Sequence, residues 1–332
     1  MKCCILGTGT WGSALAQVLC DNGHQVTAYG IDENEVNDIN ENHQNSRYFG
    51  DEVVFSESFK ATLILEEAMK DAEVYVLAVP TFAIRELLNK MEPHINGRPY
   101  FVSVAKGFDP STLMRMSEVV RDVIPVSKRK EVVSLIGPGH AEEVVLRKLT
   151  AITATSINEE DAAVIQKLFA NPYFRVYVQT DEIGAEYGVA IKNAIAIASG
   201  ISQGIGMGDN AKAALATRGL VEMIRFGTKM GGKQSTFIGL TGIGDLMVTC
   251  NSIHSRNFQA GYEIGRCGSA SEFLKNNKKT VEGIRTAQII YDIAEKNNID
   301  MPIVKGVYEV LFCDRNPRDV VYELMTRELK KE

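Results

Sequence analysis

The residue with the most unusual setting is a lysine in an apolar stretch. Lys192 is the one charged residue in segment 187–198, which reads YGVAIKNAIAIA. An ammonium group in such surroundings costs free energy unless it reaches water, a charged partner or a substrate. Two interpretations follow: a lysine whose stem packs while its head group reaches solvent, or a catalytic amine.

Asp245 is a possible partner for that amine. It directly follows segment 241–244, which reads TGIG, and it precedes an apolar run. An aspartate after glycines is often simply the N-cap of a helix. The functional interpretation is a carboxylate that orients Lys192 and supports its proton exchange.

Cations that could bind a phosphorylated substrate occur at two places. Ser255, Arg256 and Asn257 stand at a predicted helix start, where the arginine fork and the helix N–H groups both suit phosphate. Lys106 precedes Gly107 at a predicted strand end. The alternatives are a serine cap followed by a solvated arginine, and an ordinary turn lysine. Because the net charge is −6, a site for anions needs such local cations.

A glycine-rich turn near the N-terminus indicates a dinucleotide site. The motif Gly7-Thr8-Gly9-Thr10-Trp11-Gly12 lies between an apolar strand at 3–6 and a predicted helix at 13–20. A pyrophosphate needs this arrangement, because the first glycine permits the bend, the second lets the backbone approach, and the third lets helix and strand pack closely. The helix N-terminus adds unpaired N–H groups and a partial positive charge.

The second predicted strand, at 23–29, leaves the coenzyme choice open. An NAD site usually has an acid at the end of this strand, but Gly30 occupies that place and Asp32 follows two positions later. No arginine is nearby in the sequence either. The pattern therefore predicts NAD(P)H, with a slight preference for accepting NADPH.

Strands and helices alternate in the first half of the chain. Further strands are predicted at 73–80, 100–105, 132–136, 150–155 and 174–179, with helices after 81 and after 158. This order predicts a Rossmann-like α/β fold, a doubly wound and mostly parallel sheet whose ligands lie beyond the carboxyl ends of the strands. Lys106 and Gly137 fall at two such ends.

After Thr180 helical stretches dominate. They are predicted at 183–199, 210–229, 255–266 and 284–297, with two more that begin at Pro302 and Pro317. We therefore expect a dinucleotide-binding domain over 1–180 and an all-α substrate and catalytic domain over 181–332. The glycine-rich passage 231–245 is predicted to be a loop that approaches another segment closely.

Composition excludes several classes of protein. The acidic balance argues against nucleic acid as the main partner. No apolar run reaches the roughly 18 residues that a membrane span needs, and the N-terminus lacks the features of a signal peptide. The 6 cysteines show no C-x-x-C spacing or cluster with histidine, so we expect reduced thiols, a cytoplasmic protein and no metal.

With these motifs assembled, the chain resembles the NAD(P)-dependent glycerol-3-phosphate dehydrogenases of the bacterial biosynthetic type. The motifs are separated, and they follow the family's order over nearly the whole length. They are the fingerprint at 7–16, Lys106-Gly107, Gly137-Pro138, Lys192-Asn193, the segments 242–246 and 249–250, Ser255-Arg256-Asn257 and Val281-Glu282-Gly283.

The resemblance implies reversible reduction of dihydroxyacetone phosphate to sn-glycerol 3-phosphate, which supplies glycerophospholipid synthesis, and it implies a homodimer. It makes Lys192 the catalytic acid/base, with Asp245 beside it. It places the substrate against Lys106, Gly137, Lys192, Asp245, Ser255, Arg256 and Asn257. It places the dinucleotide against Gly7, Gly9, Thr10, Trp11, Gly12, Lys106, Ala141, Arg256, Val281 and Glu282.

Two departures from the family pattern stand out. Gly139-His140 replaces the usual serine or threonine and aromatic, so a hydroxyl contact to substrate is missing there. The arginine that often follows the second strand is also absent. His140 has no evident orienting partner and is expected to be structural.

Two other functions remain open at this point. One is a dehydrogenase of the same architecture that acts on a 3-hydroxy acid or a keto acid through a helix lysine. It would have no evident use for the phosphate-suited Ser255-Arg256-Asn257. The other is a non-catalytic protein that senses dinucleotides, and it would not need Lys192 in an apolar helix.

Overall fold

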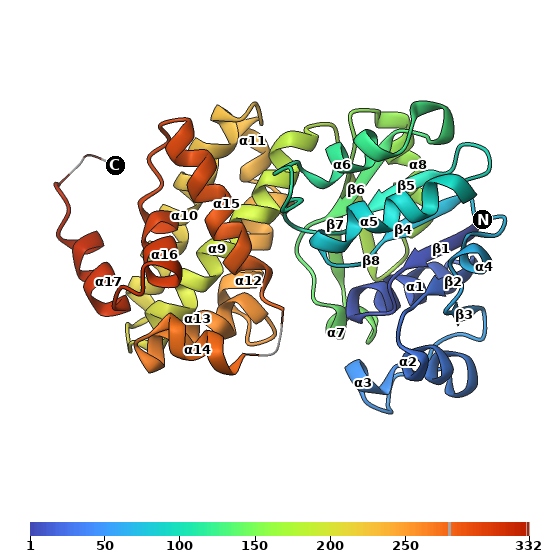
Figure 1. Ribbon diagram of the computed structural model, residues 1–332, viewed down its shortest axis with the longest axis horizontal. Coiled ribbons are helices and arrows are strands. Elements are labelled where there is room, and N and C mark those ends of the chain that lie inside the picture. Colours follow the sequence, from blue (N-terminus) through green and yellow to red (C-terminus); the bar gives the residue numbers. More distant parts are fainter. Residues whose placement is uncertain (278–279, 330, 332) are drawn as a thin grey trace. The chain divides into compact units, whose positions relative to one another are not determined.

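The computed structural model describes residues 1–277, 280–329 and 331 of the chain. By its internal contacts the chain forms two compact units, Met1–Glu182 and Ile183–Glu332. The first contains all the strands among the described residues, and the second is helical (Figure 1). Within those residues, no helix combines the length and the apolar character needed to cross a bilayer.

The first unit is built on an eight-stranded sheet with the order β3-β2-β1-β4-β5-β6-β7-β8. All neighbouring strands run parallel except β6 and β7, which are antiparallel. The predicted Rossmann-like, mostly parallel sheet is thereby confirmed. The strands are β1 Lys2–Leu6, β2 Gln25–Tyr29, β3 Phe59–Thr62, β4 Val74–Leu77, β5 Tyr100–Ser103, β6 Val132–Ile136, β7 Thr150–Thr155 and β8 Phe174–Gln179.

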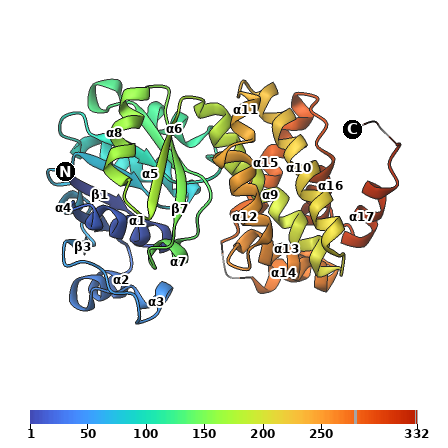
Figure 2. The same ribbon diagram turned by 180° about the vertical axis from the view of Figure 1, so that it is seen from behind.

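Helices cover both faces of this sheet (Figure 2). Alternate residues of β1 show the division: Cys3 packs with α1, α7 and α8, whereas Cys4 packs with α4, α5 and α6. The helices are α1 Thr10–Asp21, α2 Glu33–Asn37, α3 Ser46–Phe49, α4 Leu65–Met69, α5 Thr81–Met91, α6 Met116–Val123, α7 Ala141–Val144 and α8 Glu159–Phe169, with short turns η1 Asp38–Asn42, η2 Glu92–His94 and η3 Val126–Lys128.

The helical unit surrounds one buried helix, α9, whose residues between Tyr187 and Ser202 are nearly all inaccessible to solvent. The remaining elements pack about it. The central helix is α9 Glu182–Gly204, and the others are, in chain order, α10 Asp209–Lys229, α11 Gln234–Phe237, η4 Leu240–Gly244, α12 Asp245–Asn251, α13 Arg256–Cys267, α14 Ala270–Asn276, α15 Glu282–Lys296, α16 Pro302–Phe312 and α17 Pro317–Met325.

Most of the glycine-rich passage 231–245 is helical rather than the predicted loop. It forms α11 and the π-helical turn η4, which leads directly into α12. The expected close approach is real, however. A Cβ atom on Gly188 of α9 would lie 2.4 Å from the carbonyl oxygen of Thr241, so only glycine lets this turn rest against the helix.

Helices α9 and α13 also cross at backbone contact. A Cβ on Gly200 would lie 2.1 Å from the carbonyl oxygen of Phe258, and a Cβ on Gly261 would lie 2.1 Å from that of Ile197. Side chains at these positions would force the helices apart. The crossing therefore fixes the start of α13 relative to the middle of α9.

Candidate active site

A buried lysine, aspartate and threonine form the centre of the site in the helical unit. Nζ of Lys192 donates to Oδ1 of Asp245 at 2.9 Å and to Oγ1 of Thr249 at 2.6 Å. The exposed fractions of the three residues are 5%, 1% and 4%. Lys192 therefore does not extend to solvent, and its charge is balanced inside the protein.

The local fold places these groups together. Lys192 lies on α9 one turn beyond Gly188, against which the turn η4 rests. Asp245 is the first residue of α12 and Thr249 follows one turn later, so both side chains lie on one face of that helix. Asp245 is not the N-cap, because Gly244 occupies that position.

Thr249 is a further candidate site residue, to which the sequence motifs gave no role of its own. Its distance of four positions from Asp245 was the available signal, since residues at that spacing share a helix face.

A second set of hydrogen bonds joins three helices beside the lysine. Asn257 at the start of α13 donates through Nδ2 to Oδ1 of Asn193 at 2.9 Å. Its own Oδ1 accepts from the backbone N–H of Gly283 at 2.9 Å, in the first turn of α15. Asn257 thereby links the residue after Lys192 to the helix that begins at Glu282.

Ser255 and Arg256 have the arrangement of a serine cap followed by an exposed arginine. Ser255 is buried and caps α13 by accepting from the N–H of Phe258 at 3.2 Å. Arg256 is exposed, and within the described residues its guanidinium has no ion pair or hydrogen bond. It lines a pocket of about 570 Å³ together with Val281. Arg266 and the carboxylates Glu263 and Glu272 also line this pocket, so its walls carry both signs of charge.

In the sheet unit, the glycine turn has the shape that a dinucleotide requires. Gly7 has φ +120°. A Cβ on Gly12 would lie 2.1 Å from the carbonyl oxygen of Gly7, so the strand and helix meet at backbone contact. A Cβ on Gly9 would meet nothing within 4 Å, and no side chain caps α1. The turn therefore leaves open space before the N-terminus of α1, which suits a pyrophosphate.

Residues predicted for this unit also gather at the carboxyl ends of the strands. Nζ of Lys106, after β5, donates to the carbonyl oxygen of Gly137, after β6, at 2.7 Å. Trp11 is half-buried in the first turn of α1, and Ala141 is buried at the start of α7. The two units each hold part of the predicted residue set.

Comparison with known proteins decides the family. The model for the N-terminal part of NAD-dependent glycerol-3-phosphate dehydrogenase matches residues 2–162, and the model for its C-terminal part matches residues 181–322. The chain belongs to the NAD-dependent glycerol-3-phosphate dehydrogenase family. A "Glycerol-3-phosphate dehydrogenase [NAD(P)+]" of Bacillus thuringiensis is 47% identical over 331 residues, which is 100% of this chain and 97% of the relative.

Solved structures agree with this family. A glycerol-3-phosphate dehydrogenase from Coxiella burnetii has a TM-score of 0.90 at 33% identity, over 98% of this chain and 99% of that one. A yeast glycerol-3-phosphate dehydrogenase has a TM-score of 0.84 at 24% identity, over 99% of each chain, and shows likeness of fold alone. A ketopantoate reductase from Ralstonia eutropha, with a TM-score of 0.60 at 16% identity over 98% of this chain and 100% of that one, likewise shares only the fold.

At Gly139 this glycerol-3-phosphate dehydrogenase family member has little room for a side chain beside Trp11. A Cβ at that position would lie 3.1 Å from Cη2 of Trp11. This distance is tighter than ordinary van der Waals contact, so a larger residue would require the indole ring to shift. Glycine here lets Trp11 pack beside the loop after β6.

The structure near the end of β2 differs from what the sequence predicts. No arginine is nearby in the sequence, but Arg47 on α3 contacts Asp32 just after this strand. Its Nη1 lies 2.7 Å from Oδ2 of Asp32 and 2.8 Å from Oε1 of Glu35. The sequence could not show this approach, because the intervening segment folds back.

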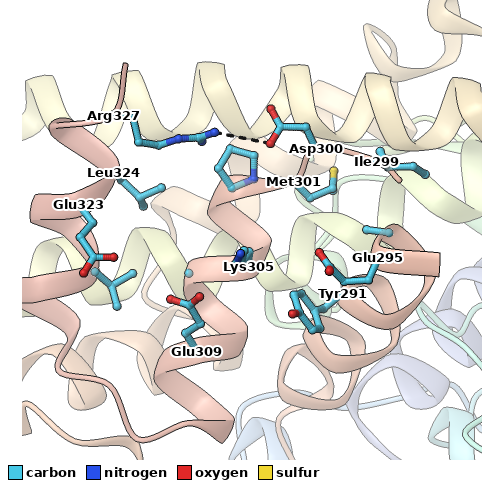
Figure 3. Close-up of a pocket in the computed structure, with 14 residues that line it drawn as sticks. Tyr291, Glu295, Ile299, Asp300, Met301, Lys305, Glu309, Glu323, Leu324 and Arg327 are labelled. Carbon is cyan, nitrogen blue, oxygen red and sulfur yellow. Dashed lines mark ion pairs between the residues drawn. The ribbon is translucent and has the colours of Figure 1, made fainter. Parts of the chain in front are cut away.

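A different pocket of about 360 Å³ lies between α15, α16 and α17 (Figure 3). Its walls are charged: Asp300 pairs with Arg327 at 3.6 Å, and Lys305 and Glu295 also line it. None of the residues predicted to contact substrate or coenzyme lines this pocket. It is therefore separate from the candidate site.

Proposed function

We propose that the chain catalyses the reversible, NAD(P)H-dependent reduction of dihydroxyacetone phosphate to sn-glycerol 3-phosphate. Family membership supports the reaction class. The observation that carries the proposal is the buried ammonium of Lys192, held 2.9 Å from Asp245 and 2.6 Å from Thr249 in the helical unit.

Lys192 is the proposed acid/base. Reduction of a ketone places growing negative charge on the carbonyl oxygen, and an adjacent ammonium both stabilises that charge and donates a proton to it. In the reverse direction the neutral amine accepts the hydroxyl proton. Asp245 and Thr249 hold the amine in one place through these changes, so that no reorganisation is needed during the reaction.

The remaining predicted residues bind and orient. We propose that Arg256 binds the phosphate of the substrate and that Asn257 presents its amide beside Lys192. Lys106 and Gly137 contribute contacts from the strand ends of the sheet unit. We propose that the open glycine turn from Gly7 to Gly12 holds the pyrophosphate of the coenzyme. When bound, the nicotinamide supplies the hydride that reduces C2.

Three further expectations belong to the same proposal. The product is a precursor of glycerophospholipids, so the enzyme supplies their synthesis. The cysteines of the described residues are all unpaired thiols, which supports a cytoplasmic location. The family resemblance supports a homodimer, and light scattering of the purified chain tests this by its mass.

The decisive experiment follows the oxidation of NADH and of NADPH by the purified chain with dihydroxyacetone phosphate. We expect oxidation of at least one coenzyme, with glycerol 3-phosphate as the product. Pyruvate, a keto acid without phosphate, serves as the control. Oxidation with pyruvate but not with dihydroxyacetone phosphate would support the keto-acid alternative. Coenzyme binding without oxidation by any substrate would support a sensing role.

A further inference from the structure

A charged cluster occupies the end of β2 in the sheet unit. Asp32 accepts from the N–H of Asn34 at 3.0 Å through Oδ1, as the N-cap of α2, and from Arg47 at 2.7 Å through Oδ2. The N–H of Asn34 holds the pKa of the Asp32 carboxyl below its usual value, so this group is ionised at neutral pH. Glu35 completes the cluster by accepting from Arg47.

Hydrogen bonds made by Thr8 and Asn45 fix this cluster to the glycine turn and the start of α1. Thr8, inside the turn, donates through Oγ1 to Oε2 of Glu35 at 2.6 Å. Asn45 is fully buried and donates to the carbonyl oxygen of Thr8 at 2.8 Å and to Oγ of Ser13 at 3.0 Å. Because Asn45 immediately precedes α3, it holds the segment that carries Arg47 against the turn.

An acid cannot occupy the position where an NAD site usually has one. A Cβ on Gly30 would lie 2.8 Å from Cγ2 and 2.9 Å from Oγ1 of Thr8. Any side chain there would collide with the turn that is expected to hold the pyrophosphate. The nearest exposed carboxylate after β2 is therefore that of Asp32, with 34% of its side chain exposed.

Arg47 presents an unused edge beside that carboxylate. Its side chain is 61% exposed. Within the described residues only its Nη1 donates, so Nε and Nη2 have no acceptor. These two atoms form the fork that binds a phosphate in bidentate fashion. Glu35 is 93% covered from solvent by contrast, with 7% of its side chain exposed, and three donors already engage it.

We propose that the Asp32–Arg47 pair selects the coenzyme: Asp32 accepts from the adenosine ribose hydroxyls of NAD(H), and Arg47 binds the 2′-phosphate of NADP(H). This inference rests on the proposed function, since it concerns the same coenzyme site. The two charges oppose each other, because Asp32 repels the phosphate that Arg47 attracts. The enzyme therefore accepts both coenzymes with little discrimination, and removing either charge shifts the preference in opposite directions.

The test measures binding rather than turnover. The chain has a single tryptophan, Trp11, in the first turn of α1, and its fluorescence reports the binding of NADH or NADPH without any substrate. We expect Arg47→Gln to weaken NADPH binding about tenfold and to change NADH binding less than about twofold. We expect Asp32→Asn, which retains the N-cap, to weaken NADH binding about fivefold and to tighten NADPH binding.

Arg147→Gln is the matched control. Arg147 forms a similar exposed pair with Asp21, at 2.9 Å, on another part of the same unit. Its loss should leave both dissociation constants within about twofold of the wild type. Circular dichroism spectra that match the wild type establish that the variants are folded.

The outcomes separate this inference from the proposed function. If the ratio of the NADPH to the NADH dissociation constant shifts in opposite directions in the two variants, the Asp32–Arg47 pair selects the coenzyme. This holds even if dihydroxyacetone phosphate is not reduced, in which case only the proposed reaction fails. If the ratio stays within about twofold of the wild type in both variants, or shifts in the same direction in both, the pair does not select the coenzyme. A wild-type chain that binds neither coenzyme overturns both.

Discussion

The hydroxyl of Thr249 lies 2.6 Å from Nζ of Lys192 and donates its own proton to the backbone carbonyl oxygen of Asp245, also at 2.6 Å. Because its single proton is used in this way, the hydroxyl oxygen can only accept from the lysine. Thr249 thus fixes the direction of the ammonium, and Asp245 supplies the opposite charge from one helical turn away.

Removing this hydroxyl should impair catalysis more than binding. We expect Thr249→Val to lower kcat about tenfold with little change in the KM for dihydroxyacetone phosphate, because the amine loses a hydrogen bond that positions it. Thr249→Ser retains the hydroxyl and should stay within about threefold of the wild type. Steady-state kinetics of the two variants measure this, and equal activity in the valine variant would contradict the positioning role.

Loss of the lysine itself should abolish the proton transfer. We expect Lys192→Ala to lower kcat by about 10²–10⁴-fold while coenzyme binding, followed by Trp11 fluorescence, stays within about twofold. Lys305→Ala is the control, since Lys305 is an exposed lysine of the same unit that lines the separate pocket. Near-normal turnover in Lys192→Ala would remove this residue from the acid/base role.

Arg256 should act through substrate affinity. We expect Arg256→Ala to raise the KM for dihydroxyacetone phosphate about 10- to 100-fold, with a smaller effect on kcat, because a charge-assisted contact to phosphate is lost. Arg315→Ala in the same unit is the matched control, since Arg315 pairs with Glu309 at 2.7 Å and does not line the pocket of Arg256. An unchanged KM in the first variant is incompatible with the phosphate assignment.

Part of the candidate site could be predicted from the sequence, because single residues differ in character from their sequence neighbours. Lys192 was the one charge in an apolar helix, and Asp245 followed a glycine turn that had to approach something closely. The structure shows that this turn approaches the helix of Lys192 itself, at Gly188. The partnership of the two residues was thus predictable, and the catalytic role of both remains a prediction.

Other features depend on tertiary contacts that no local pattern records. Arg47 stands 15 positions after Asp32 and reaches it only because Asn45 is fixed to the glycine turn. The strand β3, Phe59–Thr62, is too short to give a clear alternation. The glycines of passage 231–245 predict a loop, yet most of the passage is helical where it packs against α9, since tertiary context overrides propensity.

A buried carboxyl far from this chemistry should make stability depend on pH. Glu222 on α10 is 3% exposed and accepts from the backbone N–H groups of Ile303 at 2.7 Å and Val304 at 3.2 Å, at the start of α16. Burial raises the pKa of this carboxyl from 4.5 to about 7, although the two N–H donors act in the opposite direction. The folded chain therefore retains this proton over a range in which the unfolded chain has lost it.

The sign of the effect follows from that difference. Below pH 4.5 Glu222 is protonated in both the folded and the unfolded chain, so its stabilising contribution is fully present. As the pH rises to about 7 the unfolded chain loses this proton first, and about 3 kcal/mol of the free energy of unfolding is lost. Glu222→Gln is neutral at every pH and removes this loss, but its amide nitrogen cannot accept from one of the two N–H groups. We expect its free energy of unfolding to lie slightly below that of the wild type at about pH 5 and to decline less than that of the wild type up to about pH 8.

Urea unfolding followed by far-ultraviolet circular dichroism, repeated across this pH range, measures the effect. Glu295→Gln is the control, because it removes an exposed carboxylate from the same unit and should leave the pH dependence of the wild type in place. If the stability of Glu222→Gln declines with rising pH as steeply as that of the wild type, this carboxyl does not cause the decline. If the variant is instead less stable at every pH, the two N–H contacts to α16 contribute more than the burial of the charge costs.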